Sequence, residues 1–146
     1  SAGLPPFLKK GAGMFSGLML SQYTADMQIV EQKILSAPAF IQSIPAAADQ
    51  EDFVSMGMNG ALKTRQILEN ANGVLGIELI AGAQALDFRA PLKPGRGVLV
   101  AHEMLRGLIG HADRDYEVRN DLDTCAKILR AGKLATTVNE ALGPLA

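Results

Sequence analysis

The feature that most constrains this fold is the long stretch from Asp52 to Phe88, which contains no proline. Its apolar residues recur at helical spacing, and a helix of this length, at about 1.5 Å per residue, is on the order of 50 Å long. Its second half, residues 74–83, is apolar almost all round, which predicts burial on every side. A chain of 146 residues is too small to enclose such a helix, so the sequence predicts packing against further protein.

The rest of the chain predicts shorter helices and no strand. Apolar positions recur at helical intervals from Met14 to Ser36, and further helices are expected near 98–109, 120–130 and 135–142. The long helix contains Gly73, Gly76 and Gly82, each of which costs about 1 kcal/mol relative to alanine unless a neighbouring helix packs closely against it. The class is therefore all-α, a single helical domain over residues 1–146.

Composition excludes several classes of function. Fourteen basic and 15 acidic side chains give a net charge of -1, which offers no electrostatic case for nucleic acid or for an anionic membrane surface. One cysteine and two histidines give no plausible zinc-ligand set, so His102 and His111 are expected in surface or core roles and Cys125 in a buried, inert one. With no signal segment and no bilayer-length apolar run, we expect a piece of a longer soluble protein in the cytoplasm.

Acidic and amide side chains gather at residues 49–52, directly after a proline-bearing connection. Carboxylates are favoured in the first turn of a helix, where the backbone amides carry partial positive charge, so these residues can be explained as helix caps. The connection from Ala37 to Asp49 is long for a compact domain, and long ordered connections are often functional. Capping and function therefore both stay open for Gln50 and Glu51, while Asp52 is expected to hold the turn.

The same residues carry a resemblance to a known family. The segments Gln50-Glu51-Asp52 and Val54-Ser55-Met56-Gly57 resemble the C-terminal active-site motif of the aromatic amino acid ammonia-lyases, and most of all the histidine ammonia-lyases. Their order and spacing make the match specific, and it implies a bundle of long antiparallel helices, as in the C-terminal part of that fold. The other matching segments are Gly3-Leu4-Pro5-Pro6-Phe7-Leu8, Ser16-Gly17-Leu18-Met19, Ser43-Ile44-Pro45, Gly73-Val74-Leu75 and Gln84-Ala85-Leu86-Asp87.

The resemblance implies an activity for the whole protein: deamination of histidine to urocanate and ammonia, by a homotetramer whose active sites are completed by several subunits. In that family the electrophile is a methylidene-imidazolone that forms from a contiguous Ala-Ser-Gly. This chain contains no such tripeptide. The resemblance therefore implies that the electrophile lies in a missing N-terminal part, that these 146 residues bind no cofactor or metal, and that alone they are inactive.

By the same resemblance, Glu51 is catalytic, contacting the amine or imidazole of the substrate and taking part in proton transfer. Gln50 would be its hydrogen-bonding neighbour, and Met19 would pack on the substrate ring. Each of the last two has a plainer explanation, because Gln50 can cap a helix and methionine readily fills core gaps. Glutamate at position 51 favours a polar substrate such as histidine, whereas Phe53 replaces the histidine that is common there and leaves the substrate open.

Two alternatives stay open. One is a phenylalanine or tyrosine ammonia-lyase, or an aminomutase, that uses the same electrophile. The other belongs to a different class: a catalytically silent helical assembly module whose acids only cap a helix. Replacing Glu51 by alanine separates these, since loss of a cap costs about 1 kcal/mol of stability and leaves turnover normal.

Overall fold

The computed structural model describes residues 3–143, and over this range the chain consists of α-helices and two short 3-10 turns, with no β-strand. The all-α prediction is confirmed. The predicted single domain over 1–146 also includes residues 1–2 and 144–146, which lie outside the described range. The elements are η1 (Pro6–Leu8), α1 (Met19–Leu35), η2 (Phe40–Gln42), α2 (Gly57–Asp87), α3 (Arg96–Arg106), α4 (Arg119–Arg130) and α5 (Lys133–Leu142).

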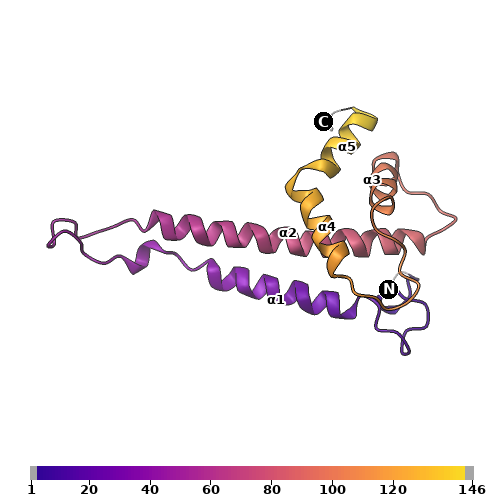
Figure 1. The fold of residues 1–146 in the computed structure, drawn as a ribbon, viewed down its shortest axis with the longest axis horizontal. Coiled ribbons are helices and arrows are strands. Elements are labelled where there is room, and N and C mark those ends of the chain that lie inside the picture. Colours follow the sequence, from indigo (N-terminus) through magenta and orange to yellow (C-terminus); the bar gives the residue numbers. More distant parts are fainter. Residues whose placement is uncertain (1–2, 144–146) are drawn as a thin grey trace.

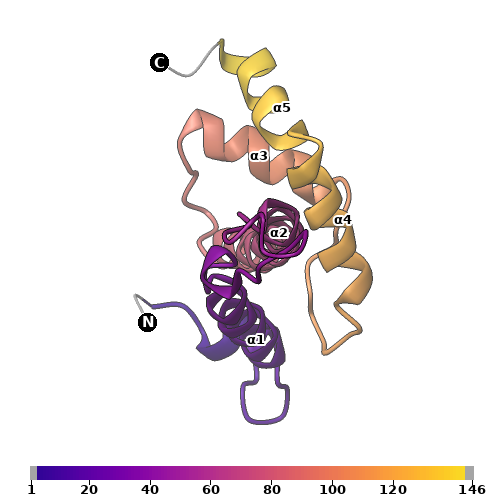
Figure 2. The ribbon, with the colours of Figure 1, turned by 90° about the vertical axis from the view of Figure 1, so that its left-hand side faces the viewer.

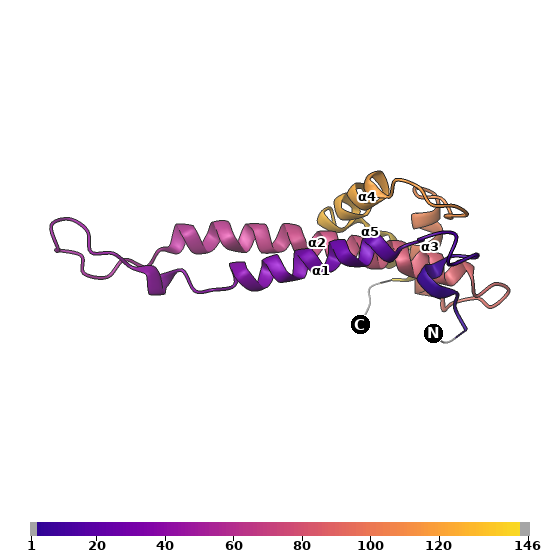
Figure 3. The ribbon, with the colours of Figure 1, turned by 90° about the horizontal axis from the view of Figure 1, so that it is seen from below.

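The two longest helices, α1 and α2, lie side by side and antiparallel, joined by a long connection at one end of the molecule (Figures 1 and 3). The 31 residues of α2 make it about 47 Å long at 1.5 Å per residue. A Cβ atom at Gly73 would lie 2.5 Å from the side-chain amide of Gln28. Because glycine has no side chain, α1 and α2 can approach closely at this point. The predicted long antiparallel helices are confirmed.

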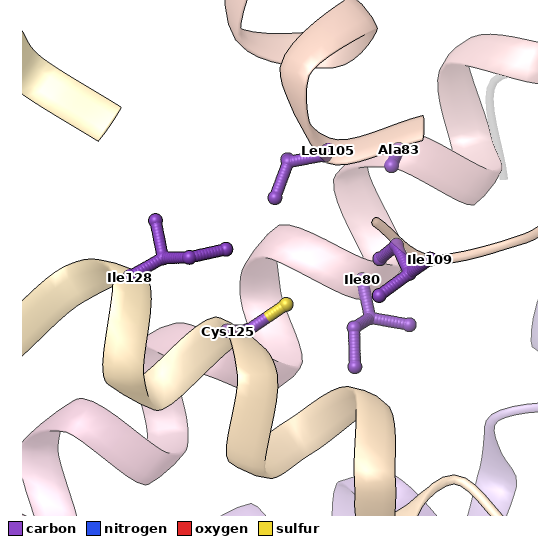
Figure 4. Packing of buried hydrophobic residues seen from close by; sticks show 6 residues of the cluster. All are labelled: Ile80, Ala83, Leu105, Ile109, Cys125 and Ile128. Carbon is purple, nitrogen blue, oxygen red and sulfur yellow. The ribbon is translucent and has the colours of Figure 1, made fainter. Parts of the chain in front are cut away.

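The C-terminal half of α2 carries the hydrophobic core. Figure 2 looks along α2 and shows α1 and α4 on different sides of it. Helix α4 crosses α2 at Gly76, where an added Cβ would lie 3.5 Å from the Cβ of Cys125. As predicted, Cys125 is fully buried. The core cluster in Figure 4 joins three helices and the residues after α3, and consists of Ile80, Ala83, Leu105, Ile109, Cys125 and Ile128.

Burial divides the molecule into two regions. No residue from 22 to 69 is buried, and we call this region, which holds most of α1, the connection and the first part of α2, the arm. Residues 3–21 and 70–143 form the body, which contains every buried side chain of the described range. Because the neighbouring helices cover only part of α2, the prediction that residues 74–83 are buried on every side is wrong: Leu75 is 45% exposed and Glu78 is exposed. Nothing packs within 4 Å of a Cβ at Gly82.

Among the described residues, no helix combines the length and the apolar character needed to cross a membrane.

Candidate functional site

Gln50 and Glu51 lie in a tight turn at the far end of the arm, ahead of α2. The amide of Ala46 donates to the carbonyl of Glu51 at 2.9 Å, and the amide of Glu51 donates to the carbonyl of Ala46 at 3.3 Å. Helix α2 begins only at Gly57, and its first turn contains no acidic residue. The prediction that these acids cap the long helix is therefore wrong, because a closed backbone turn separates them from it.

The side chains of this turn are free to meet a ligand. Gln50 and Glu51 are exposed, and neither side chain makes a hydrogen bond or an ion pair with another described residue. The same is true of Asp52, so the prediction that this residue holds the turn is wrong. The hydroxyl of Ser43 has that role instead, because it accepts a hydrogen bond from the amide of Val54 at 2.7 Å.

The backbone of the turn is strained. Ala47, Ala48 and Asp49 have φ values of 52°, 53° and 63°, in the left-handed region that residues with a Cβ rarely adopt. Each such residue costs about 1–2 kcal/mol. Strain of this kind persists only where the surroundings impose it, and it clusters at functional sites. The strained turn is therefore a reason to look for function at its neighbours, Gln50 and Glu51.

Met19 lies in a different place, as the first residue of α1 in the body. The segment before it is held by Asp115, whose carboxylate accepts hydrogen bonds from the amides of Ser16 and Gly17, both at 2.8 Å. These two bonds hold the pKa of Asp115 below its usual range. Asp115 is exposed, yet its carboxylate fixes the entry into α1.

The three predicted site residues do not meet within one copy of the chain. Gln50 and Glu51 are neighbours in the turn, but α1, with 17 residues and a length of about 25 Å, lies between Met19 and the connection that leads to them. Figure 1 shows the start of α1 in the body and the connection at the opposite end of the molecule. One copy therefore cannot place Met19 and Glu51 on the same amino acid.

The sequence reasoning missed a charged cluster at the end of α2. Asp87 accepts hydrogen bonds from His102 Nε2 at 2.8 Å, Arg106 Nη2 at 2.6 Å and His111 Nδ1 at 2.6 Å. Burial raises the pKa of Asp87, but the bonds from His111, Arg106 and His102 outweigh it and bring that pKa below its ordinary value. The spacing of His102 and Arg106, four residues apart on one helix, was the available signal.

Beside it, Gln84 joins two distant segments of the body. Its Nε2 donates to the carbonyls of Ala112 at 3.1 Å and Leu8 at 3.3 Å, and its Oε1 accepts from the amide of Ala112 at 3.2 Å. Within residues 3–143, no three His, Cys, Asp or Glu side chains gather as metal ligands. The Asp87 cluster and Gln84 are therefore best explained as a structural network of the body.

Comparison with known proteins gives a consistent result. The sequence profile of the aromatic amino acid lyase family matches residues 1–107. Histidine ammonia-lyase from Myxococcus xanthus is 44% identical over 140 residues, which are 96% of this chain and 28% of that protein. The crystal structure of histidine ammonia-lyase from Trypanosoma cruzi superposes with a TM-score of 0.89 at 34% identity, over 94% of this chain and 27% of that one.

A related activity appears among the similar structures. Tyrosine aminomutase from Streptomyces globisporus superposes with a TM-score of 0.87 at 32% identity, over 94% of this chain and 26% of that one. The chain thus spans between a quarter and a third of the length of these proteins, as the shares of 28% and 26% show. On the family profile, the sequence identity and the fold together, the chain belongs to the aromatic amino acid lyase family.

Proposed function

We propose that this chain is the C-terminal part of a histidine ammonia-lyase, which removes ammonia from histidine and leaves urocanate. The observation that carries the proposal is the strained turn that holds Gln50 and Glu51 exposed and without a partner. A backbone strained at 47–49 and two free polar side chains beside it are typical of a binding site and not of a helix cap. The similarity to histidine ammonia-lyases supports the choice of substrate.

The chemistry requires a group that orients the amino acid and a group that accepts a proton. Ionised glutamate only accepts hydrogen bonds, so Glu51 suits the ammonium or the imidazole N–H of histidine. Gln50 can donate as well as accept, which suits it to hold the same substrate beside Glu51. We assign to Glu51 the orientation of the substrate and a part in proton transfer, a contribution typically of 10²–10⁴-fold in rate.

The electrophile of this family cannot form within these residues, because the chain contains no contiguous Ala-Ser-Gly. That group supplies the electron-poor centre that makes the amine a leaving group. The free carboxylate of Glu51 and the free amide of Gln50 fit the amine-bearing substrate of such a reaction. We therefore place the electrophile in a preceding part of the protein and the substrate-orienting groups here.

The separation of Met19 from Glu51 supports an oligomer. If both contact the substrate, as the family motif implies, they come from different copies of the chain, because the whole of α1, about 25 Å long, separates Met19 from the connection that contains Glu51. The arm also exposes large apolar side chains that another copy can cover, among them Tyr23 at 64%, Ile34 at 70% and Leu68 at 60%. We propose a cytoplasmic homotetramer with shared active sites.

The test is Glu51→Ala in the complete gene product, with urocanate formation followed by its ultraviolet absorbance. We expect turnover to fall by about 10²–10⁴-fold while the melting temperature is unchanged, since Glu51 makes no contact that stabilises the fold. Asp52→Asn is the matched control, because Asp52 is adjacent, exposed and equally without partners. Normal turnover in Glu51→Ala would instead support the helical assembly module.

A second candidate activity follows from Phe53, which is 62% exposed beside Glu51 and offers an apolar surface to an aromatic ring. This favours a phenylalanine or tyrosine substrate, for an ammonia-lyase or an aminomutase. Assays of the complete gene product with histidine, phenylalanine and tyrosine, and with the β-amino acid as the aminomutase product, decide between them. The histidine proposal fails if histidine is the poorest of the three substrates.

A further inference from the structure

A cavity of about 190 Å³ lies in the body, where the start of α1 meets residues 8–9 and 112–118. Its wall contains three polar side chains that are almost completely buried: Lys9 is 2% exposed, Gln84 3% and Ser21 6%. Gln84 is occupied by the bonds to Leu8 and Ala112 described above. Buried polar groups are normally hydrogen-bonded, so the partners of Lys9 and Ser21 decide what the cavity can hold.

Lys9 has donors to spare. Its ammonium donates to the carbonyl of Ala112 at 2.8 Å and lies 5.3 Å from the centre of the Phe15 ring. An ammonium carries three donors, so two have no acceptor among the described residues. The carboxylate that also lines the cavity, Asp115, interacts with the charge of Lys9 but makes no hydrogen bond or ion pair with it, and it accepts from the amides of Ser16 and Gly17. A buried ammonium is costly unless an anion or further acceptors surround it.

Ser21 provides a second, independent signal. Ser21 is only 6% exposed, and its hydroxyl has no hydrogen-bond partner among the described residues. Ser21 and Leu20 are in the first turn of α1, where backbone amides lack a carbonyl four residues earlier in the helix. That turn itself contains no acidic residue, and the carboxylate of Asp115 is bonded to the amides of Ser16 and Gly17, which precede the helix. The wall of the cavity therefore has donors without acceptors.

The charged side chains that line the cavity indicate which kind of ligand it can bind. Lys9 and Arg114 are cationic and Asp115 is anionic, which leaves a surplus of one positive charge among the lining residues. The hydroxyl of Tyr116 donates to Asp121 at 2.8 Å and is thereby occupied. We propose that this cavity binds a carboxylate, whose single negative charge balances the site and whose two oxygens accept from Lys9 Nζ and the Ser21 hydroxyl.

This site goes beyond the proposed lyase activity and does not depend on it. A bound carboxylate would contact the first turn of α1, which begins at Met19, and would fix that end of the helix. The carboxylate can come from a free small acid or from an aspartate or glutamate elsewhere in the complete gene product. Both sources require the same donors, and the experiment below separates them.

The test uses the complete gene product and acetate as the probe, with binding followed by ¹³C NMR at constant ionic strength. For a free acid we expect saturable binding of acetate that weakens about tenfold or more in Lys9→Met, because a charge-assisted hydrogen bond is lost. Ser21→Ala removes only a hydroxyl and should weaken binding about fivefold, which keeps the test open if Lys9→Met does not fold. Lys10→Met is the matched control, since Lys10 is exposed and does not line the cavity.

If a side chain of the gene product fills the cavity, acetate does not bind the wild type, and a crystal structure shows that carboxylate on Lys9. Its replacement by alanine then opens the cavity to acetate, with the same dependence on Lys9 and Ser21. Either pattern supports the proposal. Binding of acetate that is equal in wild type and Lys9→Met overturns it, and so does a cavity filled by apolar side chains.

Discussion

The body and the arm share the helices α1 and α2, yet they differ in the burial of apolar side chains and in the hydrogen bonding of polar ones. In the body, α2 buries Ile80 and Ala83 against α3 and α4, and its last residue, Asp87, is surrounded by three hydrogen-bond donors. In the arm no residue is classed as buried, large apolar side chains are exposed, and the side chain of Glu51 has no partner among the described residues. The body is stabilised by contacts within the chain, whereas the arm is arranged for contacts with something outside it.

The largest expected effect comes from one substitution made in both regions. Ile80→Ala removes a side chain that is 5% exposed in the core, and we expect a loss of about 3 kcal/mol in the free energy of unfolding. Ile34→Ala removes the same atoms where the side chain is 70% exposed, and we expect a change within about 0.5 kcal/mol. Urea unfolding of the 146-residue chain, followed by circular dichroism, measures both.

Equal losses for the two isoleucine variants would show that the body and the arm do not differ in how their apolar side chains stabilise the chain. The same two variants also give a test in the complete gene product. If another copy covers the arm there, Ile34→Ala costs more than about 1 kcal/mol in that protein although it costs little in the 146-residue chain. If Ile34→Ala is neutral in both, the arm is not covered at this position.

The second prediction concerns Asp87. Because hydrogen bonds lower its pKa in the folded state despite burial, Asp87 adds stability at pH values above the unfolded pKa of about 4, and this is lost as the pH falls through the lowered value. At pH 7 we expect Asp87→Asn to lose about 2–3 kcal/mol, since the guanidinium of Arg106 loses its charged partner and the ring N–H groups of His102 and His111 lose a carboxylate acceptor. Unfolding experiments between pH 3 and about pH 7 measure the difference.

The control for Asp87 lies in the arm. Asp26→Asn changes an exposed carboxylate that makes no hydrogen bond with described residues, and it should alter stability by no more than about 0.5 kcal/mol at any pH. A gap between wild type and Asp87→Asn that grows as the pH falls below about 4 would contradict the sign derived above.

The helices could be predicted from the sequence, whereas the turn at the end of the arm could not. Helical spacing and prolines were enough to predict the all-α class and the long helix, because these signals are local. They did not predict where α2 begins. The turn at 46–51 is closed by hydrogen bonds of the backbone, and its residue types do not announce such a turn. A capping pattern and a strained turn can have the same composition. The backbone bonds between Ala46 and Glu51 and the positive φ values at 47–49 distinguish them, and neither can be read from the sequence.

The candidate site was predictable only through the resemblance. Residue types identified Gln50 and Glu51 as polar groups near a helix start, but not that they would be free of partners. Whether Met19 can lie near Glu51, and in which copy of the chain, depends on the tertiary structure and cannot be read from local sequence patterns. Lys9 gave no signal at all, because nothing in the sequence distinguishes it from Lys10, its exposed neighbour.

The third prediction contrasts thiols in the two regions. Burial, with a smaller contribution from Asp121, raises the pKa of the Cys125 thiol to about 11, and the residue is 0% exposed. We expect Cys125 to react with a thiol reagent only when the body opens. A cysteine placed in the arm by Ser55→Cys, at an exposed position, should react at least about 100-fold faster under native conditions. Equal rates would show that the body opens as readily as the arm.

The smallest effect tests whether the strain of the arm serves the site. Ala48 has a φ of 53°, and Ala48→Gly relieves about 1 kcal/mol of strain while the more flexible unfolded chain offsets about half of it, for a net gain of about 0.5 kcal/mol. Ala61→Gly, at an exposed position within α2, should instead lose about 1 kcal/mol. If the strained turn fixes the direction of Glu51, Ala48→Gly raises stability and lowers turnover in the complete gene product. A variant that gains stability and keeps its turnover would show that the strain is not needed by the site, because relief of the backbone would then leave Glu51 as effective as before.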